Sequence, residues 1–145
     1  MINKDYKVGI GKRKNAVARV RLYEEIKENI VMGDGFVKKG DIFVNGKRIE
    51  DYFRGLISKA KYEEPLRITN TLGKYAFTVL VQGGGQEGQI DAFIHGVSRI
   101  LSRMDEKNKQ ILKKKGFLTR DARVRERRKV GMGGKARRKR QSPKR

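Results

Sequence analysis

The stretch that decides the fold is YAFTVLVQGGGQEGQIDAFIHGVSRILSRM, residues 75–104. Tyr75 to Val81 is rich in β-branched and aromatic residues, which predicts a buried strand. After the glycines, apolar residues recur at spacings of three and four, which predicts an amphipathic helix. These residues are Ile90, Phe93, Ile94, Val97, Leu101 and Met104. A strand followed directly by a long helix indicates a mixed α+β domain.

The glycine run at 83–88 matches the pattern G-x-G-x-x-G, which is typical of dinucleotide-binding sites. Such a site also needs an acidic residue after a second parallel strand, whereas Asp105 falls at the end of the predicted helix. We therefore predict a tight strand-to-helix turn. A nucleotide-using enzyme built on this loop is the less favoured alternative. The glycines of the predicted turn are Gly83, Gly84, Gly85 and Gly88.

Outward from this unit, residues 7–23 read as two strands joined by a polar turn at 11–15. In the second strand, alternate residues from Ala16 to Leu22 are apolar, so Arg19 and Arg21 fall on the opposite face. The turn carries Lys12, Arg13 and Lys14. It is either an ordinary solvated turn or part of a basic patch that faces phosphates. The nearby Arg19 and Arg21 favour the patch.

The rest of the sequence pattern predicts a single domain over residues 1–115. Residues 24–40 are predicted to form a long hairpin excursion, and 42–44 a short strand before the hairpin turn Asn45-Gly46. Short helices are predicted at 51–57, from Pro65 to a C-cap at Gly73, and at 107–115 before Gly116.

The charge of the chain is strongly positive: 37 Lys and Arg oppose 16 Asp and Glu, a net charge of +21. Such self-repulsion needs a polyanionic partner, either a nucleic acid or an anionic membrane. The longest apolar-rich run spans only seven residues, 75–81, far short of a membrane-spanning helix. The N-terminus shows no apolar signal segment. A nucleic-acid partner and a cytoplasmic location are therefore predicted, with the nucleus or an organelle matrix left open.

Residues 116–145 form a cationic C-terminal tail with 13 basic and 2 acidic side chains. Without an apolar period it is predicted to be disordered until a partner orders it. Thirty extended residues reach roughly 100 Å at most. A solubilising or targeting role is the alternative to binding phosphates. The candidate phosphate contacts in the tail are Arg120, Arg123, Arg125, Arg127, Arg128, Lys129, Lys135, Arg137, Arg138, Lys139, Arg140, Lys144 and Arg145.

Signs of catalysis are weak. His95 is the only histidine, the chain has no cysteine, and no acidic pair suggests general acid–base chemistry. We predict a protein that is not an enzyme, with no cofactor, no metal and no small-molecule substrate.

Four motifs in order resemble the bacterial-type ribosomal protein S-nine family of the small subunit. The first is GKRKNAVARV at 11–20. The second is GGGQEGQ at 83–89, followed by Ala92, Gly96 and Arg99. The third is GFLTRDAR at 116–123, followed by Glu126, Arg127 and Lys129. The last combines Ala136-Arg137-Arg138 with the terminal Lys144-Arg145. The chain departs from the family in its long 24–40 segment, in Ile100, and in Ser142-Pro143, where an aromatic residue and a serine are usual.

The resemblance implies a two-layer α+β sandwich like domain two of ribosomal protein S-five. A four-stranded sheet would carry helices on one face, and an extended basic tail would follow. Partners would be small-subunit rRNA in the head, neighbouring head proteins and peptidyl-site tRNA. Lys12, Arg13, Lys14, Arg19 and the tail cations up to Arg140 would contact rRNA, while Lys144 and Arg145 would approach the tRNA anticodon stem-loop. A free architectural nucleic-acid-binding protein is the alternative.

Overall fold

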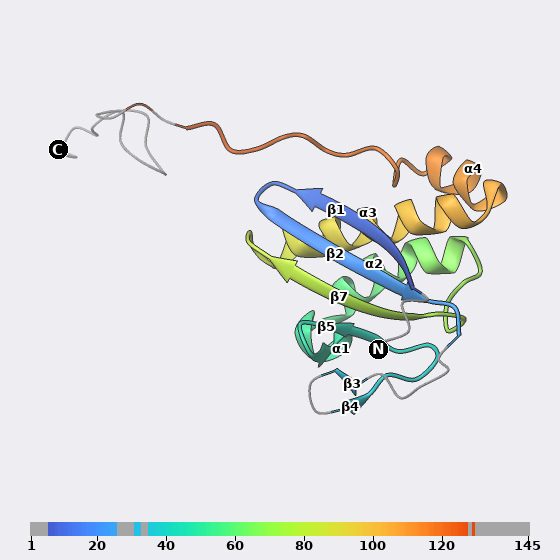
Figure 1. Cartoon of the computed structure of the whole chain (residues 1–145). Coiled ribbons are helices and arrows are strands. Elements are labelled where there is room, and N and C mark those ends of the chain that lie inside the picture. The colour runs from blue at the N-terminus through green and yellow to red at the C-terminus, as the bar shows by residue number, and fades with distance from the viewer. Residues whose placement is uncertain (1–5, 26–30, 33–34, 128, 130–145) are drawn as a thin grey trace.

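Figure 1 shows the computed structural model of the chain, which describes residues 6–25, 31–32, 35–127 and 129. It is a mixed α+β fold, as predicted. Its elements follow in the order β1 (Tyr6–Arg13), β2 (Ala16–Tyr23), β3 (Val31–Met32), β4 (Gly35–Phe36), β5 (Ile42–Val44), β6 (Lys47–Arg48), α1 (Ile49–Tyr52), α2 (Leu56–Ile68), β7 (Ala76–Gln82), α3 (Gln86–Met104) and α4 (Glu106–Lys114). Within the described residues, no helix is long and apolar enough to cross a bilayer.

The main sheet has five strands in the order β1-β2-β7-β5-β6. Its neighbours pair antiparallel except β5 and β7, which run parallel. The prediction of four strands is wrong because Lys47 and Arg48 add β6 at one edge. Asn45 and Gly46 have positive φ angles of 48° and 81°, which give the tight turn that suits the twist of a hairpin. The chain therefore folds straight back, and Lys47 pairs with Val44.

The predicted excursion at 24–40 contains a separate two-stranded antiparallel sheet, β3-β4. Val37, which follows it, packs in a small cluster with Tyr23, Phe43 and Ala76. These residues lie on the face of the main sheet that the helices leave uncovered. The excursion therefore covers one end of that face.

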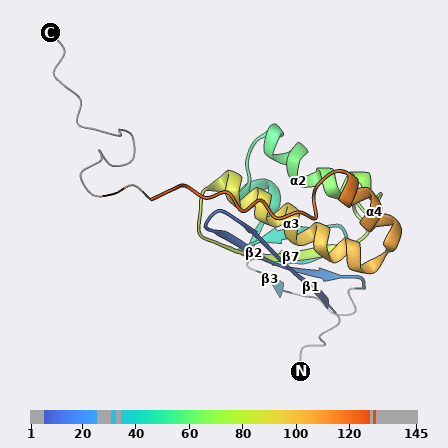
Figure 2. The same cartoon turned by 90° about the horizontal axis from the view of Figure 1, so that it is seen from above.

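Helices α2 and α3 lie on the other face of the sheet, with α3 lying across β1 and β2 and α4 packed against α3 (Figure 2). The core between the layers includes Val20, Leu22, Val79, Phe93 and Val97, all fully buried. Two glycines of β1 allow α3 to approach closely, since a Cβ at Gly9 or Gly11 would collide with the α3 backbone. This close packing fixes α3 against the end of the β1–β2 hairpin.

Two helix predictions are wrong in their bounds. The helix predicted at 51–57 is divided, because α1 ends at Tyr52 and Gly55, with a φ of 104°, precedes α2. Pro65 lies inside α2 rather than at its start. The missing Pro65 N–H is tolerated because α2 buries Tyr62 and Leu66 against the core, so packing outweighs the lost hydrogen bond.

Candidate nucleic-acid interface

The three consecutive cations at the β1–β2 turn point in different directions. Gly11 faces α3, so the alternation of a strand turns Lys12 to the uncovered face of the sheet and Arg13 to the helix side. Lys14 lies in the turn itself, exposed and with a φ of 50°. The predicted cluster is therefore divided between two faces of the molecule.

The open sheet face combines basic and aliphatic side chains. Its members are Val8, Ile10, Lys12, Arg19, Arg21 and Leu80, all exposed. The register places Ile10 opposite Arg19, and Arg19 opposite Leu80. The Arg21 guanidinium lies 5.1 Å from the centre of the Tyr6 ring, a distance typical of a cation–π contact. Arg19 and Arg21 thus share a face, as the alternation predicted.

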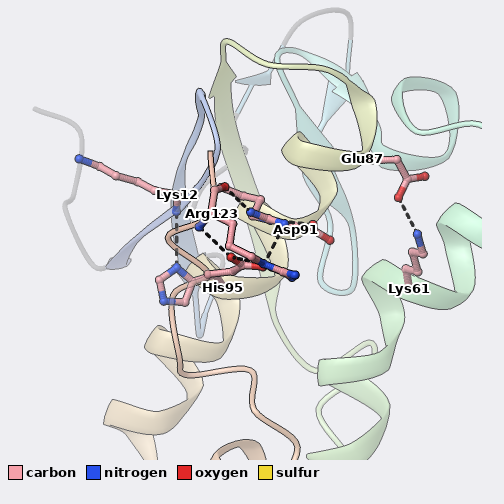
Figure 3. A network of polar contacts seen from close by, with 8 residues as sticks. Lys12, Lys61, Glu87, Asp91, His95 and Arg123 are labelled. Atoms are coloured by element: carbon pink, nitrogen blue, oxygen red, sulfur yellow. Dashed lines mark hydrogen bonds and ion pairs between the residues drawn. The ribbon is translucent and has the colours of Figure 1, made fainter. Parts of the chain in front are cut away.

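On the helix side, Arg13 joins α3 to the start of the tail. Its side chain is only 14% exposed; its Nε lies 3.5 Å from Asp91 Oδ2, and its Nη2 lies 3.0 Å from Asp121 Oδ2. Its Nη1 also donates to the Arg123 carbonyl at 2.8 Å. Figure 3 shows Asp91 and Arg123 within this network. The Arg13 guanidinium therefore contacts three residues, all of which lie far from Arg13 in the sequence.

Asp121 and Arg123 also bind one another. The Asp121 carboxylate accepts hydrogen bonds from the Arg123 backbone N–H at 2.9 Å and from Nη2 at 2.7 Å. These bonds, and after them the positive charge of Arg13, lower the pKa of Asp121 well below its usual range. The pKa of Arg123 is raised by the same partner. Asp121 therefore carries its negative charge at neutral pH.

His95 lies beside this network on α3 (Figure 3). Its Nδ1 accepts a long hydrogen bond of 3.5 Å from the Lys12 backbone N–H. Burial and then the positive Arg99 lower the pKa of His95. Accepting at Nδ1 requires that this nitrogen carry no proton, which suits a neutral imidazole. No cluster of metal-ligand type occurs among the described residues.

The first residues of the tail are attached to the domain. Phe117 and Leu118 pack against the hydrophobic core, although the sequence showed no apolar period there. The chain then runs back along α3 toward the β1–β2 turn (Figures 1 and 2). Val124 and Arg125 line a shallow hollow together with Lys14 and the glycine turn. The two basic segments predicted from the sequence therefore meet at one end of the molecule.

Several of the described cations of the tail are exposed: Arg120, Arg125, Arg127 and Lys129. The other predicted contacts lie outside the described residues; they are Arg128, Lys135, Arg137, Arg138, Lys139, Arg140, Lys144 and Arg145.

The glycine run forms the predicted tight turn between β7 and α3. Gly83 and Gly84 have positive φ angles of 74° and 66°, and a Cβ at Gly83 would meet the Asn15 carbonyl. Gly85 and Gly88 have neither constraint. Glu87 lies in the first turn of α3, where it pairs with Lys61 at 2.5 Å. Its negative charge lies where a helix N-terminus would hold a phosphate, which argues against nucleotide binding.

Two residues of α3 that hold β1 were not predicted from the sequence. Arg99 Nη1 donates to the Ile10 carbonyl at 2.7 Å, and Arg103 Nη1 to the Val8 carbonyl at 3.4 Å. Together with His95 they occupy the outer edge of β1, which blocks the addition of another strand. Asp91 and Asp121 were also missed. Asp121 could have been noticed in the sequence, because it is an acidic residue inside a cationic tail.

Comparisons with known proteins agree with this geometry. The family model described as "Ribosomal protein S9/S16" matches residues 11–145. A curated relative, "Small ribosomal subunit protein uS9" of Maridesulfovibrio salexigens, is 45% identical over 133 residues, which cover 92% of each chain. The chain therefore belongs to the ribosomal protein S9 family, whose members are structural, non-enzymatic constituents of the small ribosomal subunit.

Proposed function

We propose that this chain binds rRNA in the head of the small subunit, beside other head proteins, in the ribosomes of the cytoplasm. Lys12, Lys14 and Arg19 would contact phosphates from the domain. The exposed arginines and lysines of the tail would continue the same contact away from it.

The observation that carries this proposal is the meeting of two basic segments. Arg13 and Arg123 are 110 positions apart, yet they are joined by a hydrogen bond. Lys14 consequently lines the same hollow as Arg125. A surface that begins on the domain and continues along an extended cationic chain suits a folded RNA, because its phosphates also lie along continuous paths.

The mechanism is charge neutralisation and positioning. Arginine forks and lysine ammonium groups bind phosphate oxygens, which fixes register without reading bases. The tail contains no aromatic residue beyond Phe117, so stacking on bases contributes little there.

We further propose that the terminal Lys144 and Arg145 approach the anticodon stem-loop of peptidyl-site tRNA. The support is the positive charge of this end and the family's terminal motif. Removing both residues should weaken tRNA binding at that site while leaving subunit assembly intact. Loss of assembly would instead assign the tip to rRNA folding.

Directed hydroxyl-radical probing tests the rRNA contact. The chain has no cysteine, so Lys14→Cys and Lys129→Cys each provide one attachment point for an iron chelate. In assembled small subunits both probes should cleave rRNA of the head, at neighbouring positions. Subunits treated with unattached chelate are the control. Absence of cleavage from both positions would contradict the proposal, and so would absence of the protein from small-subunit fractions of a sucrose gradient.

A further inference from the structure

The start of the tail carries an acid where a phosphate-binding segment should have none. Asp121 is one of two acidic residues in 116–145, and a carboxylate repels the phosphates that the surrounding cations attract. In the fold its charge faces inward, to Arg13 and Arg123. Its partners belong to this chain, so its role is intramolecular.

Three side chains hold this part of the tail, and we call them the tail clamp: Arg13, Asp91 and Asp121. Arg13 bridges Asp91 on α3 and Asp121 in the tail, while Phe117 and Leu118 pack against the hydrophobic core. The chain is therefore held at 117–118 and again at 121–123. Two points of attachment fix a direction, whereas one would leave the chain free to swing.

We propose that the tail clamp sets the direction in which the cationic tail leaves the domain. It carries residues 117–123 back along α3 and releases the chain beside Lys14. Arg13 is in this reading a positioning residue: three contacts within the protein occupy its guanidinium, so it is not offered to a phosphate. The effect on RNA binding rests on the proposed function, but the direction of the free tail does not.

The tail clamp should strengthen RNA binding because it holds the tail in place before the RNA binds. A segment already held in its bound direction loses less conformational entropy when it binds. The clamp also keeps the cations of the tail next to those of the β1–β2 turn, so that one RNA contacts both. Breaking it should therefore weaken RNA binding even when the change makes the protein more positive.

The direction of the tail is measurable in the free protein. Spin labels on Ile57→Cys and Val124→Cys, two exposed positions, report the distance from α2 to the tail by pulsed electron resonance. The full chain should give one narrow distance distribution, which Asp121→Ala should broaden. Arg13→Gln, changed from the domain side, should broaden it in the same way.

Glu126→Ala is the matched control. It removes the other acid of the tail, with the same change of charge, and no ion pair of Glu126 is formed among the described residues. The distribution should then stay narrow. An equally narrow distribution in Asp121→Ala and Glu126→Ala would overturn the clamp.

The Kd for small-subunit rRNA is a second measurement. The direction in which it changes distinguishes an effect of the tail clamp from an effect of net charge alone. Glu126→Ala should leave the Kd unchanged or lower it, since it removes a repulsive charge. Asp121→Ala should instead raise the Kd several-fold, and circular dichroism should show that the domain remains folded. Tighter binding by both variants would overturn the clamp's role in RNA binding. Failure of the unmodified chain to bind would instead count against the proposed function.

Discussion

Arg13 and Lys14 are neighbours that carry the same charge, but the fold gives them opposite surroundings. Arg13 is mostly buried between Asp91 and Asp121. Lys14 is exposed at the tip of the β1–β2 turn and has no ion pair in the part of the chain that the structure describes. The few acidic residues, more than the many basic ones, decide which cations hold the fold together and which face outward.

The tail repeats this contrast. Both Arg123 and Arg127, four residues on, are exposed, but Arg123 is paired with Asp121 whereas Arg127 forms no ion pair among the described residues. Composition alone treats the tail as one polycation. The structure divides its described part into an attached segment, 117–123, and an exposed segment that begins at Val124.

Deleting 124–145 should give the largest effect, because it removes the exposed segment and leaves the attached one. The deletion takes away 11 basic side chains. The slope of log affinity against log salt for small-subunit rRNA should fall by about 5–8, with affinity reduced on the order of 100-fold or more. Fluorescence anisotropy at several salt concentrations measures both.

The melting temperature is the control for this deletion. It should hardly change, because Phe117 and Leu118 stay on the core. An unchanged salt slope would contradict the assignment of the exposed segment to phosphates.

Gly11→Ala should give the next largest effect, since it separates β1 from α3 and so disturbs the attached segment at its base. The added Cβ collides with the Ala92 carbonyl, which no side-chain movement relieves. The free energy of unfolding should fall by about 3 kcal/mol. Urea denaturation followed by circular dichroism measures this value.

Gly88→Ala is the matched control within the same layer. Its Cβ meets only the Arg13 carbonyl and the Ala16 side chain, at 3.6 and 3.7 Å. It should be neutral or should stabilise by up to about 1 kcal/mol through helix propensity. Similar losses in both variants would mean that the β1–α3 contact is less tight than described.

Arg13→Gln and Lys14→Gln test the opening comparison directly with one change of charge each. Arg13→Gln should destabilise by about 1–2 kcal/mol, because Asp91 and Asp121 lose their shared partner. Lys14→Gln should change stability by less than about 0.5 kcal/mol but weaken RNA binding and lower the salt slope by roughly one. Urea denaturation and RNA titration are measured for both variants. Equal stability of the two variants would contradict the different roles of Arg13 and Lys14.

Local patterns predicted much of the fold. The apolar period predicted α3, and Asn45-Gly46 predicted the hairpin turn. Tertiary burial decided what these patterns missed: Ser98, a polar residue outside the apolar series of its helix, is fully buried, and α2 continues through Pro65. The Arg13–Asp121 pair escaped prediction because charge and spacing do not show which residues meet across more than a hundred positions.

The smallest effect concerns pH and His95, which lies on α3 beside the tail clamp. Its pKa is lowered in the fold from 6.5, so the unfolded chain binds more protons between the lowered value and 6.5. Stability is therefore fully present above pH 6.5 and is lost as pH falls through that window. Asp121 does not contribute there, because its own window lies below 3.8.

His95→Gln keeps a side chain that donates and accepts hydrogen bonds but does not titrate. Between about pH 7.5 and about pH 5.5, the unmodified chain should lose more unfolding free energy than His95→Gln. Parallel pH profiles would mean that the fold does not lower the pKa of His95.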